Sequence, residues 1–145
     1  MVDAWEDGPS TILVAIDGSE TALRAGAYAA GMARRQHSRL ACLYVRAVSG
    51  LAAAAPGAVS AIRATQDTLS AELRDAVEKE SARIGLDTVF IERQGNPFTE
   101  LVRLAEELQV DAVVVGASTK AGHRFVGSLA VHLVRIAHWP VTVVP

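Results

Sequence analysis

The sequence is poor in the features that mark secreted, membrane-spanning or nucleic-acid-binding proteins. Its single cysteine, Cys42, cannot form a disulfide within the chain, and its place in an apolar run predicts a buried, unreactive thiol. No apolar run approaches the roughly 20 residues that a membrane-spanning helix needs. The net charge of -2 at pH 7 offers no basic surface for nucleic acid or for an anionic membrane. We therefore predict a cytoplasmic protein that binds neither nucleic acid nor membranes.

The marks of export, of a second domain and of a metal site are also missing. Residues 1–9 are acidic, without the basic and apolar regions of a signal peptide, and are predicted to form a flexible tail. The 145 residues suit a single domain over residues 1–145. No metal-ligand spacing connects the four histidines, which are His37, His123, His132 and His138. We predict no metal-ligating residues.

Short apolar runs alternate with longer segments of helical periodicity. The runs predict strands at 11–16, 40–45, 87–92, 113–115 and 141–144. The segments between them predict helices over about 20–37, 58–84, 97–108 and 128–138. Gly85 is typical of a residue that ends a helix, and Asn96-Pro97 is typical of a helix start. One helix between successive strands requires parallel pairing, right-handed crossovers and helices on both faces of the sheet. The fold class is therefore α/β.

The apolar positions of each helix predict the face that it buries. In the first helix they are mostly small, which favours close packing on a sheet: Leu23, Ala27, Ala30 and Ala33. In the second helix they are Ile62, Leu69, Leu73, Ala76 and Val77. In the third helix they are Phe98, Leu101, Ala105 and Leu108.

The loop after the fourth strand is the stretch that most favours a ligand site. The strand ends at Gly116, a loop rich in small and polar residues follows, and Gly127-Ser128 opens a helix. Free N–H groups and the positive end of the dipole at a helix start suit an anion. Loop cations would suit a polyphosphate, and they are Lys120, His123 and Arg124. The same pattern is also compatible with an ordinary strand-to-helix connection.

Several known active-site and phosphate motifs are absent. The spacing from Gly116 to Gly122 is one residue too long for a P-loop, and Asp17-Gly18-Ser19 is not a dinucleotide-binding fingerprint. No Ser-His-Asp or Cys-His set can be identified, because Ser19 and Ser128 occupy positions typical of helix caps. We therefore expect no catalytic residues, and at most slow ATP hydrolysis.

Three segments resemble the universal stress protein family. They are the opening 12–19, the stretch from Val113 through Gly116 to Gly127-Ser128, and the ending 139–144. The resemblance covers nearly the whole chain. It implies a Rossmann-like, five-stranded parallel sheet of order 3-2-1-4-5, of the adenine nucleotide alpha hydrolase type. It also implies a cytoplasmic homodimer and, in one branch of the family, ATP bound at the carboxyl edge of the sheet.

Carried over by position, the family's nucleotide contacts fall on two groups of residues. Those at the adenosine would be Ala15, Ile16, Asp17 and Val45, the last through its backbone. Those at the ribose and phosphates would be Gly116, Gly127, Ser128 and Leu129.

The loop departs from the motif of the nucleotide-binding branch, which is glycine, two residues, glycine, nine residues, then Gly-Ser or Gly-Thr. Thr119 stands at the second glycine, and only seven residues separate it from Gly127. The hydroxyls of Ser118 and Thr119 would replace lost backbone donors, and Gly122 would supply the turn of the shorter loop.

We predict an ATP-binding stress protein with a sensing or regulatory role, its ATP accompanied by Mg²⁺. The alternative is a nucleotide-free dimeric module that acts through protein contacts. In either case the last strand, Val141, Thr142, Val143 and Val144, is apolar and lies at a sheet edge. A bare edge of this kind favours antiparallel pairing with a second copy across a two-fold axis.

Overall fold

Strands and helices alternate along the chain, as the sequence predicts. The computed structural model describes residues 10–47, 55–118, 127–136 and 138–145. Within these ranges the elements are β1 (Thr11–Ala15), α1 (Glu20–Gln36), β2 (Arg39–Ala47), α2 (Pro56–Ile84), β3 (Thr88–Gly95), α3 (Pro97–Glu107), β4 (Ala112–Gly116), α4 (Ser128–Ile136) and β5 (Val141–Val144). None of the described helices is long and apolar enough to cross a membrane.

The five strands form one parallel sheet in the order β3-β2-β1-β4-β5. This confirms the predicted fold class and strand order. The order reverses between β1 and β4, which are neighbours through the register Leu13 to Val113 and Val14 to Val114. In parallel α/β sheets such a reversal opens a crevice at the carboxyl ends of the strands, because the connections leave to opposite sides.

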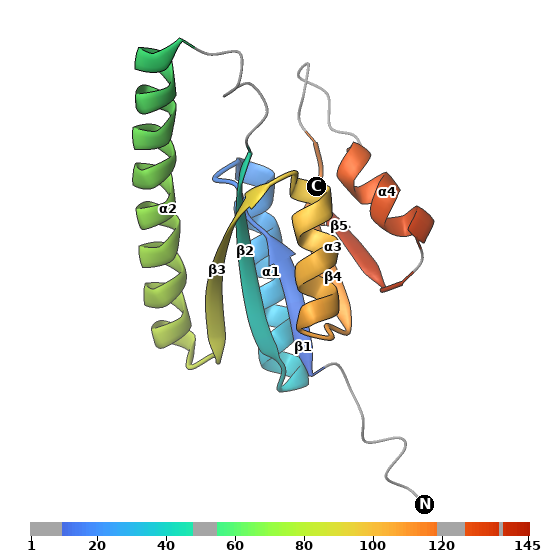
Figure 1. Cartoon of the computed structure of the whole chain (residues 1–145). Coiled ribbons are helices and arrows are strands. Elements are labelled where there is room, and N and C mark those ends of the chain that lie inside the picture. Colours follow the sequence, from blue (N-terminus) through green and yellow to red (C-terminus); the bar gives the residue numbers. More distant parts are fainter. Residues whose placement is uncertain (1–9, 48–54, 119–126, 137) are drawn as a thin grey trace, which may run out of the picture.

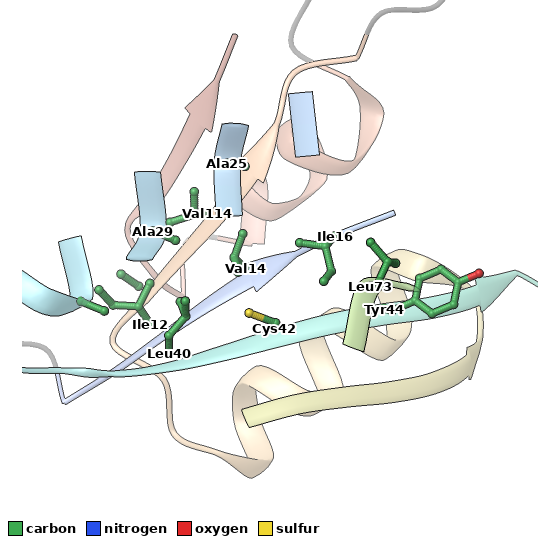
Figure 2. Packing of buried hydrophobic residues seen from close by; sticks show 12 residues of the cluster. Ile12, Val14, Ile16, Ala25, Ala29, Leu40, Cys42, Tyr44, Leu73 and Val114 are labelled. Atoms are coloured by element: carbon green, nitrogen blue, oxygen red, sulfur yellow. The ribbon is translucent and has the colours of Figure 1, made fainter. Parts of the chain in front are cut away.

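Helices cover both faces of the sheet (Figure 1). On β1 the side chains of Ile12 and Val14 join α1 and α2 in one core cluster, whose members Figure 2 shows from close by. Leu13, which points to the opposite face, joins a second cluster with α3 and α4. Because a central strand is buried on both faces, it shows no polar alternation. Cys42 lies in the first cluster, and burial raises the pKa of its thiol to about 12, as expected for an unreactive cysteine.

The buried face of α1 differs from the predicted one. Ala33 is buried and Ala30 packs against the core cluster, as predicted, but Leu23 is 54% exposed and Ala27 is also exposed. The face on the sheet is instead a row of alanines, Ala22, Ala25, Ala29 and Ala33. An alanine row lets the helix backbone approach the strands more closely than leucine would. Close approach therefore decides the orientation of α1, and hydrophobicity alone does not predict it.

The predicted apolar face of α2 is correct for Leu69, Leu73 and Val77 but wrong for Ile62 and for Ala76, which is exposed. Leu73 is buried, and Leu69 and Val77 pack against the same core cluster. Ile62, by contrast, is 37% exposed. The helix has 29 residues and is longer than the strands it covers, so its first turns rise beyond the ends of β2 and β3 (Figure 1). The spacing of apolar residues therefore continues into turns of α2 that have no sheet beneath them.

Candidate functional site: a cavity at the carboxyl edge of the sheet

A cavity of about 790 Å³ lies where the strand order reverses. Its walls come from the carboxyl ends of β1, β2 and β4 and from the first turns of α1, α3 and α4. This size falls within the range of about 300–1,000 Å³ typical of small-molecule sites. The fold therefore forms the crevice at the position that the topology favours.

The described residues predicted for the site all line this cavity. They are Ala15, Ile16, Asp17, Val45, Gly116, Ser118, Gly127, Ser128 and Leu129. The other predicted residues lie outside the described ranges, and they are Thr119, Lys120, Gly122, His123 and Arg124. The cavity thus brings together residues from the first, second and fourth strands and from the helix start after the loop.

Asp17 is held at the cavity by the turn that follows β1. Its Oδ1 accepts a hydrogen bond from the backbone N–H of Ser19 across 2.8 Å. Gly18 between them has a φ of +84°, which glycine adopts without the strain that a Cβ brings. Ser19 in turn caps α1, since its hydroxyl accepts from the N–H of Ala22 at 3.2 Å, as predicted. The other carboxylate oxygen of Asp17 accepts no hydrogen bond from a described residue and faces the cavity side of the turn as a candidate ligand contact.

Gly116 lies where α1 crosses the end of β4. A Cβ at this position would lie 2.6 Å from the carbonyl carbon of Thr21 and 2.8 Å from the N–H nitrogen of Ala22. Real Cβ atoms do not approach backbone this closely, so only glycine lets the first turn of α1 lie against β4. The predicted role of Gly116 at the ligand therefore accompanies a packing role that the sequence pattern does not reveal.

Three helix N-termini face the cavity, but their amides are not equally available. Ser19 caps α1, and the Oδ1 of Asn96 caps α3 by accepting from the N–H of Thr99 at 3.1 Å. α4 begins after Gly127, which has no side chain with which to cap it. No described side chain bonds to the first amides of α4. Its N-terminus therefore offers donors and positive dipole potential to an anion.

The charges on the described part of the lining are sparse. Asp17 is the one carboxylate among these lining residues, and His132 is the one side chain that can carry a positive charge. Within the described part of the lining, backbone N–H groups therefore supply most of the hydrogen-bond donors for an anion. The three basic loop residues that the sequence places between β4 and α4 lie outside the described ranges.

Among the lining residues that sequence reasoning did not assign to the site, Phe98 and His132 are the two that carry aromatic rings. Phe98 was predicted in the buried stripe of α3, where Leu101 and Ala105 are indeed buried, but Leu108 is 38% exposed. The rings of Phe98 and His132 lie edge to face, with centroids 5.4 Å apart and planes at 71°. The topology could have indicated Phe98: in a parallel sheet, a helix that follows a strand begins at the carboxyl edge of the sheet, where the site lies.

Known proteins and solved structures include relatives of this chain. The universal stress protein MJ0531 of Methanocaldococcus jannaschii is 30% identical over 141 residues, which cover 92% of this chain and 80% of that protein. The structure is similar to universal stress protein UspA from Lactobacillus plantarum, with a TM-score of 0.79, 26% identity and coverage of 94% and 97% of the two chains. It is also similar to a universal stress protein in complex with cAMP, with a TM-score of 0.66, 27% identity and coverage of 95% and 98%.

The family assignment rests on a sequence profile, a sequence relative and the fold. The sequence profile described as the Universal stress protein family matches residues 9–145. The relative from Methanocaldococcus jannaschii agrees with it in sequence, and the solved structures agree with it in fold. The resemblance found in the sequence is confirmed. This chain belongs to the universal stress protein family.

Proposed function

We propose that this protein binds ATP or a related adenine nucleotide in the cavity, works as a homodimer, and has a sensing or regulatory role. The observation that carries the proposal is the start of α4, whose first amides no described side chain caps and which lines one cavity together with Asp17. An anion-binding helix start and a carboxylate in one crevice suit a ligand with phosphates at one end and a nucleoside at the other.

Two further observations support an adenine nucleotide. The nine described residues that the family pattern assigns to ATP share a single cavity. A structurally similar protein of the family, 27% identical, has been crystallised with cAMP. The phosphates would lie at Gly127 and Ser128, and the nucleoside would lie toward Asp17 and Val45. Mg²⁺ would be held mainly by the phosphates, because Asp17 is the one carboxylate on the described lining.

The homodimer proposal rests on the edge strand β5. Among the described strands β5 pairs only with β4, and its side chains are all partly exposed. The carbonyl oxygen of Pro140 accepts a hydrogen bond from the N–H of Val113 in β4. The carbonyl oxygen of Val144 accepts one from the N–H of Ala117, which directly follows β4. Because backbone groups alternate along a strand, those of Val141 and Val143 point to the open edge. They are free to pair with β5 of a second copy.

Isothermal titration calorimetry and thermal unfolding with millimolar ATP and Mg²⁺ test the nucleotide proposal. At an ATP concentration 100 times its Kd, the free energy of unfolding should rise by about 2.7 kcal/mol. GTP serves as the matched control for the base, and inorganic triphosphate for the phosphates. Neither heat nor a shift in Tm with ATP would overturn the nucleotide proposal and favour a nucleotide-free dimeric module.

A further inference from the structure

We infer that Phe98, positioned by His132, packs against the base of the bound nucleotide and makes the cavity select a nucleoside over a bare phosphate chain. This inference rests on the proposed function and extends it to residues outside the nucleotide motif. Among the described lining residues, Phe98 and His132 carry the two aromatic rings. An aromatic wall increases the affinity for a planar base but not for a triphosphate, because stacking on a ring requires that the ligand also have a π-face.

Phe98 occupies a fixed position at the sheet edge. It lies in the first turn of α3, which begins at Pro97 and is capped by Asn96. Its side chain is partly buried and packs against the core cluster that also contains Leu43 and, at its margin, Val45. These two β2 residues line the same cavity. The ring thus borders the apolar part of the crevice, on the side that the family pattern assigns to adenine.

The amides nearest Phe98 are poorly suited to phosphate. The side chain of Asn96 accepts from the N–H of Thr99 and so occupies a donor of the first turn of α3. In that turn Pro97 has no N–H, so the N–H of Phe98 is its one amide without a described partner, whereas no described side chain bonds to the first amides of α4, at Ser128 and beyond. The ligand's charged end should therefore lie at α4, which leaves its uncharged end for the wall formed by Phe98.

His132 fixes the ring of Phe98 from the neighbouring helix. It lies one turn after Ser128 on α4, and its ring meets Phe98 at 5.4 Å between centroids and 71° between planes. Edge-to-face pairs at this separation are attractive. His132 is thus a positioning residue, whose contribution to ligand affinity depends on the presence of an aromatic ring rather than on its charge.

The test compares Phe98→Leu with wild type by calorimetry, using ATP, adenosine and inorganic triphosphate as ligands. Leucine keeps an apolar side chain at the position and removes the ring. We expect ATP and adenosine to bind about tenfold more weakly and inorganic triphosphate to bind unchanged. Phe98→Tyr should retain the wild-type affinity for all three. Phe90→Leu is the matched control, because Phe90 is a partly buried phenylalanine of the other core cluster.

His132 is tested with two variants that separate its ring from its charge. His132→Ala should weaken ATP and adenosine about threefold to fivefold, and His132→Phe should restore the wild-type affinity. Equal affinity of Phe98→Leu and wild type for ATP, when wild type binds ATP, would overturn this inference and leave the proposed function intact. Equal loss of triphosphate and ATP would also overturn it. A wild type that binds no nucleotide would overturn both.

Discussion

The hydroxyl of Thr21 donates a hydrogen bond of 2.8 Å to the carbonyl oxygen of Ala117, and the two residues are 96 positions apart in the sequence. Thr21 lies in the first turn of α1 and is buried, while Ala117 directly follows β4. The bond joins the two sides of the crevice at the point where the strand order reverses. Gly116 makes it possible, because it allows the backbone of Thr21 to lie directly against β4.

Replacement of Gly116 by alanine should destabilise the protein by about 3 kcal/mol, at the upper end of the usual cost of overpacking. The added Cβ would meet backbone atoms of Thr21 at 2.6 Å, and backbone cannot yield as a flexible side chain can. Urea denaturation measures the loss. Gly57→Ala is the control: an added Cβ there has no atom within 4 Å, and alanine favours helix. It should be neutral or stabilise by up to about 1 kcal/mol.

Asp111 is expected to make stability depend on pH. Its Oδ2 accepts from the N–H of Ser10 at 2.7 Å, the hydroxyl of Ser10 at 3.0 Å and the N–H of Thr11 at 3.1 Å. Burial acts to raise the pKa of the Asp111 carboxyl, but these hydrogen bonds outweigh it and lower the pKa below its ordinary value. The stabilisation is therefore present above the pKa of the unfolded state and is lost as the pH falls through that of the folded state.

Asp111→Asn mimics the protonated side chain and tests this dependence. At pH 7 the variant should be less stable than wild type by about 1 kcal/mol, a modest value because the carboxylate is exposed. At pH 3 the difference between the two proteins should be smaller than at pH 7, because the stabilisation is lost as the pH falls toward the lowered pKa of the folded state. A difference that is equal at both pH values would show that the loss arises from geometry rather than charge.

Gly127→Val should abolish ATP binding. Even a Cβ at Gly127 would lie 3.0 Å from the Cβ of Ser118, and two further methyl groups would occupy the space beside the first amides of α4. Calorimetry with ATP measures the effect, and far-UV circular dichroism checks that the sheet and helices remain. Retained ATP affinity in a folded variant would place the phosphates away from α4.

Asp17→Ala should weaken the binding of ATP and adenosine by at least about tenfold while leaving that of inorganic triphosphate largely unaffected. A hydrogen bond to a charged group contributes about 1.5–3 kcal/mol, and about 1.4 kcal/mol corresponds to a factor of ten. The carboxylate lies on the cavity, and one of its oxygens is already fixed by Ser19. Titration of the three ligands against both proteins separates the nucleoside from the phosphate contribution. A parallel loss of triphosphate affinity would contradict a role at the nucleoside.

Val143→Pro should separate the homodimer into monomers of 15.3 kDa without unfolding them. Proline removes an N–H that points to the open edge, whereas the bonds to β4 come from the alternate residues. Size exclusion with light scattering measures the mass. Thr142→Pro is the contrasting variant, because it would remove a group facing β4 and should reduce stability. A wild type of 15.3 kDa at micromolar concentration would exclude the dimer.

Local chemistry was sufficient to predict the elements and several of their ends. Asn96 and Pro97 start α3, Ser19 caps α1, and Gly85 ends α2 with a φ of +66°, each as the residue type requires. These signals act within a few residues of one another, so they can be read without knowledge of the rest of the chain. The parallel sheet follows from the alternation of strands and helices. Its order came from the family resemblance.

The sequence by itself thus determined the elements, the sheet and the crevice to which Asp17 and Gly127 belong. Only the tertiary structure decided which side of α1 is buried, how far α2 extends past the sheet, and that Phe98 and His132 meet at the crevice wall. The physical reason is that these relationships depend on distances between segments far apart in the chain. The spacing of apolar residues indicates that a helix has an apolar face. For α1, close packing against Gly116 decides which face meets the strands.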